Sequence, residues 1–293
     1  MTAGSEAERI AGIGPLLERF PVLFVDVWGV LHDGTAFPGV AETLIQARAG
    51  GATVILVSNS PARPSHIADR LGHLGIRADA YDHIITSGEL SRRYLLDRRG
   101  AEDWQPIFLV REGNGPSWLP SLPHPVVERV EDAAMIVVVG MPQLTEKAAC
   151  GDGLHGSLHG SLHGIVAQGR QHGIPMICAD SDELYPEYGA IRLGPGWLAR
   201  RYREAGGEVV EFGKPNTPIY LEALELAGHP PREEVLVIGD NIATDILGGA
   251  CHGFASLLVL EGGVLGDVPP DALSEQYLQH GASPDYVAQR LAW

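Results

Sequence analysis

Short apolar segments rich in valine, isoleucine and leucine recur along this chain without alternating polar residues. Four of them, V-L-F-V-D, T-V-I-L-V-S, V-L-V-I-G-D and S-L-L-V-L, lie at 22–26, 53–58, 235–240 and 256–260. Continuous apolar runs of this length are typical of parallel strands that are buried on both faces. Helical patterns lie between them, and those after Pro38 and Thr217 each end at a glycine. The pattern predicts repeated βαβ units and an α/β fold with a doubly wound parallel sheet.

The middle of the chain carries a second set of strand patterns. The segments I-F-L-V, M-I-V-V-V-G and P-M-I-C-A-D, at 107–110, 135–140 and 175–180, are again short and apolar. They predict a separate α/β module that is inserted into the first one as a cap domain. The predicted organisation is a core of residues 1–93 and 190–293 around an inserted cap of residues 94–189.

Polar residues follow several of these apolar runs. They are Asp26, Ser58 with Asn59, Lys214 after V-V-E-F-G, and Asp240 with Asp245 close behind. In an open α/β sheet the ligand crevice lies beyond the carboxyl ends of the strands. Although each residue alone could be an ordinary loop residue, we expect the ordered set to converge on one site.

The residue types in this set suit the transfer of a phosphoryl group. Asp26 can attack phosphorus as a carboxylate if a cation screens the repulsion between the two anions. Asp240 supplies a second carboxylate for that cation, and Mg²⁺ prefers one or two carboxylates with waters and a phosphate oxygen. Lys214 adds a positive charge, while the Ser58 hydroxyl and the backbone amides near Asn59 can donate hydrogen bonds to the phosphate.

Four short motifs in this order resemble those of a known family. The segments D-V-W-G-V, V-S-N-S, G-K-P-N-T-P and G-D-N-I-A-T-D are similar to the motifs of the haloacid dehalogenase (HAD) superfamily. Their spacing resembles its class IIA branch, the p-nitrophenyl phosphatase-like or NagD-like hydrolases. The resemblance covers nearly the whole chain and implies a Rossmann-like core with a cap between the second and third motifs.

The resemblance also implies a role for each matched residue. Asp26 would be the nucleophile, and Ser58 and Lys214 would bind the phosphate. Mg²⁺ would be held by Asp26, by Asp240 and by the backbone carbonyl two residues after the nucleophile, at Trp28. Asp245 would brace these ligands.

A further segment, C-A-D-S-D at 178–182, is similar to a cap loop of this branch that usually reads T-N-x-D and faces the substrate. Asp180 and Asp182 are therefore candidate substrate-binding residues. Asp180 stands where asparagine is usual, so the substrate preference of the branch does not carry over directly.

Trp28 departs from the family pattern D-x-D-G. The family's second aspartate protonates the leaving group and later activates water, and an indole N–H does neither because it does not titrate. Loss of such a group typically slows catalysis by ~10²–10⁴-fold. His32 and Asp33 could replace it, or they could form a turn with their side chains in solvent. We expect Trp28 to pack beneath the cap, with stacking on a flat substrate as the alternative.

These residues and the resemblance together predict a Mg²⁺-dependent phosphatase that acts on a small phosphorylated metabolite through an aspartyl phosphate at Asp26. Two alternatives stay open because of Trp28. One is a phosphate-ligand binding or regulatory protein with little turnover. The other is a phosphotransferase, for which slow hydrolysis of the intermediate is an advantage.

The composition restricts which partners the protein is expected to bind and where in the cell it is expected to work. The chain has 293 residues, 45% hydrophobic and 20% charged, with a formal net charge of −16, which disfavours nucleic acid and anionic membranes. Cys150, Cys178 and Cys251 form no disulfide framework, and no apolar run is long enough to cross a bilayer. We therefore expect a cytoplasmic protein, and class IIA relatives suggest a homodimer through the cap.

A tandem repeat, G-D-G-L-H-G-S-L-H-G-S-L-H-G, occupies residues 151–164. If it were helical, His155, His159 and His163 would share a face and could hold a transition metal. The alternative, a local duplication in a flexible surface segment, is favoured because no further ligand is evident. We assign the repeat no function.

Overall fold

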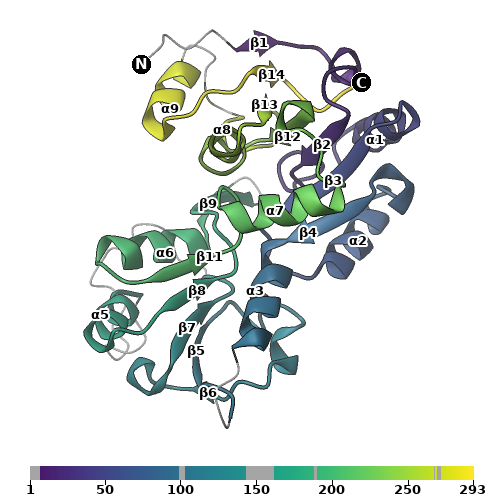
Figure 1. Ribbon diagram of the computed structural model, residues 1–293. Helices are drawn as coiled ribbons and strands as arrows, with labels where there is room; N and C mark the ends of the chain where they lie inside the picture. The colour runs from purple at the N-terminus through teal and green to yellow at the C-terminus, as the bar shows by residue number, and fades with distance from the viewer. Residues whose placement is uncertain (1–6, 99–102, 143–161, 188–189, 267, 269–271) are drawn as a thin grey trace.

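Two parallel β-sheets form the framework of the protein in the computed structural model, which describes residues 7–98, 103–142, 162–187, 190–266, 268 and 272–293. The seven-stranded larger sheet has the order β1-β14-β13-β12-β2-β3-β4, and the five-stranded smaller sheet has the order β11-β8-β7-β5-β6. Every strand pair in both sheets is parallel. Figure 1 shows the smaller sheet below the larger one. The predicted α/β fold with parallel sheets is confirmed.

The strands have the following bounds. Those of the larger sheet are β1 (Glu8–Arg9), β2 (Val22–Val25), β3 (Thr53–Ser58), β4 (His83–Thr86), β12 (Val235–Gly239), β13 (Ala255–Val259) and β14 (Tyr286–Ala288). Those of the smaller sheet are β5 (Ile107–Val110), β6 (Val126–Val127), β7 (Met135–Val138), β8 (Met176–Cys178) and β11 (Val209–Glu211). An antiparallel hairpin, β9 (Leu184–Glu187) and β10 (Ala190–Leu193), stands apart from both sheets.

The helices connect these strands. They are α1 (Val40–Ala49), α2 (Pro64–His73), α3 (Ser87–Asp97), α5 (Leu162–His172), α6 (Pro195–Glu204), α7 (Thr217–Leu226), α8 (Leu247–His252) and α9 (Leu273–His280). Shorter turns of helix are η1 (Gly14–Leu16), η2 (Ala78–Ala80), η3 (Leu119–Ser121), η4 (Val130–Asp132), η5 (Arg232–Glu234) and the π-helix η6 (Ile242–Ile246). No helix in the described part of the chain is long and apolar enough to cross a membrane.

Helices cover both faces of the larger sheet, which explains the unbroken apolar runs. In β2, Leu23 and Val25 pack in one hydrophobic cluster with α1 and α2, whereas Val22 and Phe24 pack in another with α7. A strand that is buried on both faces needs apolar residues at every position. The sheet is therefore doubly wound, as the sequence predicts.

The smaller sheet is also covered on both faces, and this moves one predicted boundary. Helices α5 and α6 pack on one face, and residues of α3 and the 118–122 segment pack on the other. Trp197 of α6 belongs to this smaller core, and β11 pairs with β8. The predicted cap boundary at 189/190 is thus wrong, because residues 195–211 belong with the smaller sheet. The apolar run of β11 identifies a strand, but only the tertiary packing decides which sheet it joins.

Candidate active site

A cavity of about 480 Å³ lies where the carboxyl ends of strands from both sheets meet. Residues after β2, β3 and β12 line one side of it, and residues after β5, β7 and β8 line the other. Asp26, Asn59 and Asp240 belong to the first group, together with Ser58 at the end of β3, while Glu112, Gly140 and Asp180 belong to the second. The cavity is thus enclosed by two sets of loops, as expected for a ligand site at the ends of parallel strands.

Lys214 lies between two buried carboxylates at the base of the cavity. Its Nζ donates hydrogen bonds to Asp26 Oδ1 at 2.5 Å and to Asp245 Oδ1 at 2.7 Å. All three residues are buried, with Lys214 only 2% exposed. The backbone N–H of Asp26 donates to Ile238 O at 2.8 Å and fixes this carboxylate at the boundary between β2 and β12.

Asp240 lies close to Asp26 and Asp245, and two glycines, Gly29 and Gly263, make room for its side chain. Its Oδ2 accepts a hydrogen bond from the backbone N–H of Val264 at 2.9 Å. A Cβ on Gly29 would lie 2.5 Å from Asp240 Oδ2, and a Cβ on Gly263 would lie 2.4 Å from Asp240 Cβ. Two backbone segments therefore enclose the carboxylate of Asp240 and fix its direction.

The three carboxylates suit a divalent cation. Oxygen atoms of Asp26, Asp240 and Asp245 all lie within 4.8 Å of one another. Burial raises the pKa of Asp26 in spite of Lys214, and burial with the neighbouring carboxylates raises the pKa of Asp240 and brings that of Asp245 to about 6. Because one lysine does not balance three carboxylates, an added cation would relieve this repulsion. Hard oxygen ligands of this kind fit Mg²⁺.

Asn59 uses its side chain to hold Lys214 in place. Its Oδ1 accepts from the backbone N–H of Lys214 at 2.7 Å, and its Nδ2 donates to Lys214 O at 3.1 Å and to Asp182 Oδ1 at 2.9 Å. The sequence predicts that backbone amides near Asn59 contact the phosphate, whereas the side-chain amide of Asn59 is hydrogen-bonded to protein partners. Its side chain therefore orients Lys214 and ties it to the loop after β8.

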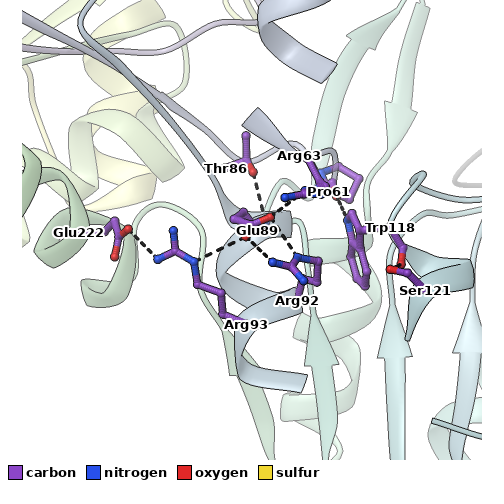
Figure 2. A network of polar contacts seen from close by, with 9 residues as sticks. All are labelled: Pro61, Arg63, Thr86, Glu89, Arg92, Arg93, Trp118, Ser121 and Glu222. Atoms are coloured by element: carbon purple, nitrogen blue, oxygen red, sulfur yellow. Dashed lines mark hydrogen bonds and ion pairs between the residues drawn. The ribbon is translucent and has the colours of Figure 1, made fainter. Parts of the chain in front are cut away.

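Ser58 is the last residue of β3, and neighbouring elements hold the loop that follows it. Ser58 Oγ accepts from the backbone N–H of Ser60 at 3.2 Å, which leaves its hydroxyl hydrogen for a ligand. The N–H of Gly88 donates to Ser60 O at 3.1 Å, and a Cβ on Gly88 would lie 2.0 Å from Pro61 O. Figure 2 shows Trp118 Nε1 donating to that same Pro61 carbonyl, at 2.7 Å, from the smaller unit.

A charged network extends this support into α3 (Figure 2). Thr86 caps the N-terminus of this helix, because its Oγ1 accepts a hydrogen bond from the N–H of Glu89 at 3.1 Å. The carboxylate of Glu89 accepts from Arg92 at 2.7 Å and from Arg63 at 3.2 Å, and Arg93 continues the network to Glu222. Sequence reasoning missed Gly88, Glu89 and Trp118, because no local motif indicates that these residues meet the loop after β3.

Trp28 and His32 form one side of the cavity. Their rings meet edge to face, with centroids 5.0 Å apart. His32 is buried, its Nδ1 accepts from the N–H of Gly34 at 3.2 Å, and burial followed by the charge of Arg70 lowers its pKa to about 4. The imidazole is therefore neutral near pH 7, and it cannot serve as a general acid there. Asp33 is exposed and accepts from the N–H of Thr35 at 3.2 Å, which is the turn that the sequence left as an alternative.

Asp180 and Asp182 face the cavity from the loop after β8. The N–H of Asp182 donates to Asp180 Oδ1 at 2.9 Å. Burial is the main cause that raises the pKa of both carboxyls, to about 6 for Asp182 and well above the ordinary value for Asp180. The structure thus brings the predicted nucleophile, phosphate-binding, metal-binding and cap-loop residues to one cavity, whereas Asp33 lies outside it. Asn59 and Asp182 are hydrogen-bonded to each other there.

The histidine repeat lies largely outside the described part of the chain. His155 and His159 lie outside the described residues, and His163 is an exposed residue of α5. The described residues therefore do not test the alternative of metal ligation by the three histidines, and the repeat keeps no assigned function.

Two family models match the segments that carry the site. One, described as haloacid dehalogenase-like hydrolase, matches residues 23–114, and one described as HAD-hydrolase-like matches residues 211–293. Together these ranges contain the residues around Lys214 and the three clustered carboxylates, as well as the loop after β3.

Similar proteins cover nearly the whole chain. Human glycerol-3-phosphate phosphatase is 25% identical over 94% of this chain and 90% of its own length, and the ribonucleotide monophosphatase NagD of Escherichia coli K12 is 27% identical over 81% and 86%. A haloacid dehalogenase-like hydrolase from Brucella suis superposes with a TM-score of 0.74 at 28% identity, covering 97% of this chain and 100% of that one. A glycerol phosphate phosphatase from Mycobacterium tuberculosis in complex with magnesium shares the fold, with a TM-score of 0.62 at 22% identity over 93% and 75%.

Proposed function

We propose that this chain, which belongs to the class IIA branch of the haloacid dehalogenase superfamily, is a Mg²⁺-dependent phosphatase that forms an aspartyl phosphate at Asp26. It is a phosphoric monoester hydrolase, and its substrate is a small phosphorylated metabolite. The observation that carries the proposal is the buried contact of Lys214 with Asp26 and Asp245, next to Asp240, at the end of the cavity.

The nucleophile and its neighbours divide the work of the first step. Asp26 attacks the phosphorus in line with the leaving oxygen, and the phosphoryl group passes from that oxygen to the carboxylate. Lys214 lies within 2.5 Å of Asp26 and offsets the negative charge that gathers there. Ser58 donates its free hydroxyl hydrogen to a phosphoryl oxygen. Water then attacks the aspartyl phosphate and regenerates Asp26.

The metal site follows from the donor set. Asp26 and Asp240, with the backbone carbonyl of Trp28, would hold Mg²⁺, and Asp245 would brace them through Lys214. When bound, Mg²⁺ would supply positive charge for the transferring phosphoryl group. The proposed assignment rests on the clustered buried carboxylates and on their excess of negative charge over Lys214.

The smaller unit would act as the cap that selects the substrate. Its loops after β5, β7 and β8 face the cavity, so the body of the substrate would contact residues such as Glu112 and Asp180. A homodimer that forms through this cap is also proposed, and the molar mass from light scattering would test it.

Trapping of the intermediate tests the proposal. With p-nitrophenyl phosphate and Mg²⁺, rapid acid quenching of the wild type should leave phosphate on a peptide that contains Asp26. Asp26→Asn should abolish both the trapped phosphate and turnover, while Asp33→Asn, at an exposed turn outside the cavity, should change neither. A wild type that binds phosphate esters without turnover would support a regulatory protein instead. Turnover that rises with an added alcohol acceptor would support a phosphotransferase.

A further inference from the structure

Hydrolysis through Asp26 requires a group that moves protons, and residue 28 does not supply it. An alkoxide leaves phosphorus slowly unless it is protonated, and water attacks the intermediate slowly unless a base removes its proton. The indole of Trp28 neither donates nor accepts a proton near neutral pH. If the proposed function is right, another residue at the cavity must carry this proton.

The residues nearest to Trp28 do not fit the role. His32 is buried, and its Nδ1 already accepts from the N–H of Gly34. Asp33 is exposed and outside the cavity, where it closes a turn with Thr35. Lys214 is committed to two carboxylates, which hold its proton firmly. The proton carrier must therefore come from another wall of the cavity.

The loop after β8 places a pair of carboxyls on the opposite wall. Attack by Asp26 in line with the leaving oxygen puts that oxygen on the far side of phosphorus, toward the smaller unit. Asp180 and Asp182 line the cavity there, and each interacts electrostatically with Asp26. Both carboxyls thus lie on the side where the leaving group departs.

The backbone of this loop is fixed by close packing. The N–H of Gly196 donates to Asp182 O at 3.0 Å, and a Cβ on Gly194 would lie 2.0 Å from the same oxygen. Asp182 Oδ1 is anchored by Asn59 across the cavity, and the N–H of Asp182 fixes Asp180 Oδ1. The second carboxyl oxygen of Asp180 has no hydrogen-bond partner among the described residues, so it is available to a ligand.

We propose that Asp180 is the general acid and base of this enzyme, and that Asp182 positions it. In the first step the bond between phosphorus and the leaving oxygen breaks, the phosphoryl group bonds to Asp26, and the leaving oxygen takes the proton of Asp180. In the second step the Asp180 carboxylate takes a proton from water as that water attacks phosphorus. Asp26 leaves as a carboxylate, and Asp180 is protonated again.

The electrostatic setting supports the assignment made from geometry. Burial, followed by the negative charge of Asp182, raises the pKa of Asp180 well above its ordinary value, while Lys214 opposes this rise. A raised pKa favours the protonated carboxyl, which is the form that general acid catalysis requires. The general acid would thus lie in the loop after β8 instead of at position 28, where the family pattern places it.

Two phosphate esters with different leaving groups test this role. Nitrophenolate leaves without a proton, whereas the glycerol alkoxide needs one. Asp180→Asn should slow the hydrolysis of glycerol phosphate by ~10²–10⁴-fold. With p-nitrophenyl phosphate it should keep the rate of the first turnover but show a burst of nitrophenolate equal to the enzyme concentration, because the intermediate then lacks its base. Asp33→Asn is the matched control and should behave as the wild type does.

A rescue experiment separates proton transfer from structure. Asp180→Ala should recover turnover of glycerol phosphate when formate is added, and Trp28→Asp combined with Asp180→Asn should recover part of it. An Asp180→Asn enzyme with the wild-type ratio of rates for the two esters would overturn the assignment, as would an Asp180→Ala enzyme that formate does not help. If only the role of Asp180 is wrong, the wild type should still yield a trapped aspartyl phosphate. If the proposed function is wrong, no aspartyl phosphate should be trapped.

Discussion

The amide of Asn59 offers the sharpest test of how the site is held together. The change Asn59→Ala removes the hydrogen bonds of 2.7 and 3.1 Å to the peptide of Lys214 and the bond of 2.9 Å to Asp182. Asn59 is 3% exposed, so the N–H and C=O of Lys214 would lose their partners away from water. Each such buried group costs roughly 1–3 kcal/mol. We expect a total loss of about 2–5 kcal/mol in the free energy of unfolding.

Urea unfolding followed by circular dichroism would measure this loss, and steady-state kinetics would measure the displacement of Lys214. Because Lys214 Nζ lies 2.5 Å from Asp26 Oδ1, a shift of about 1 Å should lower kcat/KM by ~10²-fold. The matched control is Asn114→Ala, an exposed asparagine on the cavity rim, which should change stability by less than about 0.5 kcal/mol. Equal stability of the Asn59 and Asn114 variants, with unchanged kcat/KM, would refute the proposed role of Asn59 in holding Lys214.

Three further predictions concern other parts of the site. Gly29→Ala (φ +84°) places a Cβ 2.5 Å from Asp240 Oδ2, whereas the Cβ of Gly39→Ala (φ +81°) meets nothing within 4 Å. Calorimetry should therefore show a loss of stability of about 1–2 kcal/mol for Gly39→Ala, which is the backbone cost alone, and a clearly larger loss for Gly29→Ala. Asp240→Asn should weaken Mg²⁺ binding by more than roughly tenfold in titration calorimetry, and unchanged affinity would contradict the metal assignment. For Glu89, burial raises the pKa but Arg92 and its neighbours outweigh it, so the folded pKa lies below 4.5. The ion pair thus stabilises the folded protein above that pH. At pH 7 the free energy of unfolding of the wild type should exceed that of Glu89→Gln by about 1–3 kcal/mol. This difference should vanish as the pH falls below 4.5, where the urea midpoints of the two proteins should become equal.

The local pattern of apolar and polar residues predicts much of the architecture. Unbroken apolar runs identify strands such as β2 and β3, because a strand covered by helices on both faces tolerates no polar position. The polar residues that end these runs gather at one edge because parallel strands point the same way. The chemical types of Asp26, Lys214 and Asp240 then restrict the chemistry, since few other side chains could serve in their places.

The contacts that orient these groups were decided only by the tertiary structure. Asn59 and Lys214 are 155 residues apart in the chain, and Trp118 and Pro61 are 57 apart, so no local pattern specifies either hydrogen bond. The sheet that β11 joins, the burial that makes His32 neutral and the position of Asp180 across the cavity depend on the packing of distant elements in the same way. A strand propensity depends on neighbours in sequence, whereas a pairing partner, a local dielectric environment and a direction of approach depend on neighbours in space.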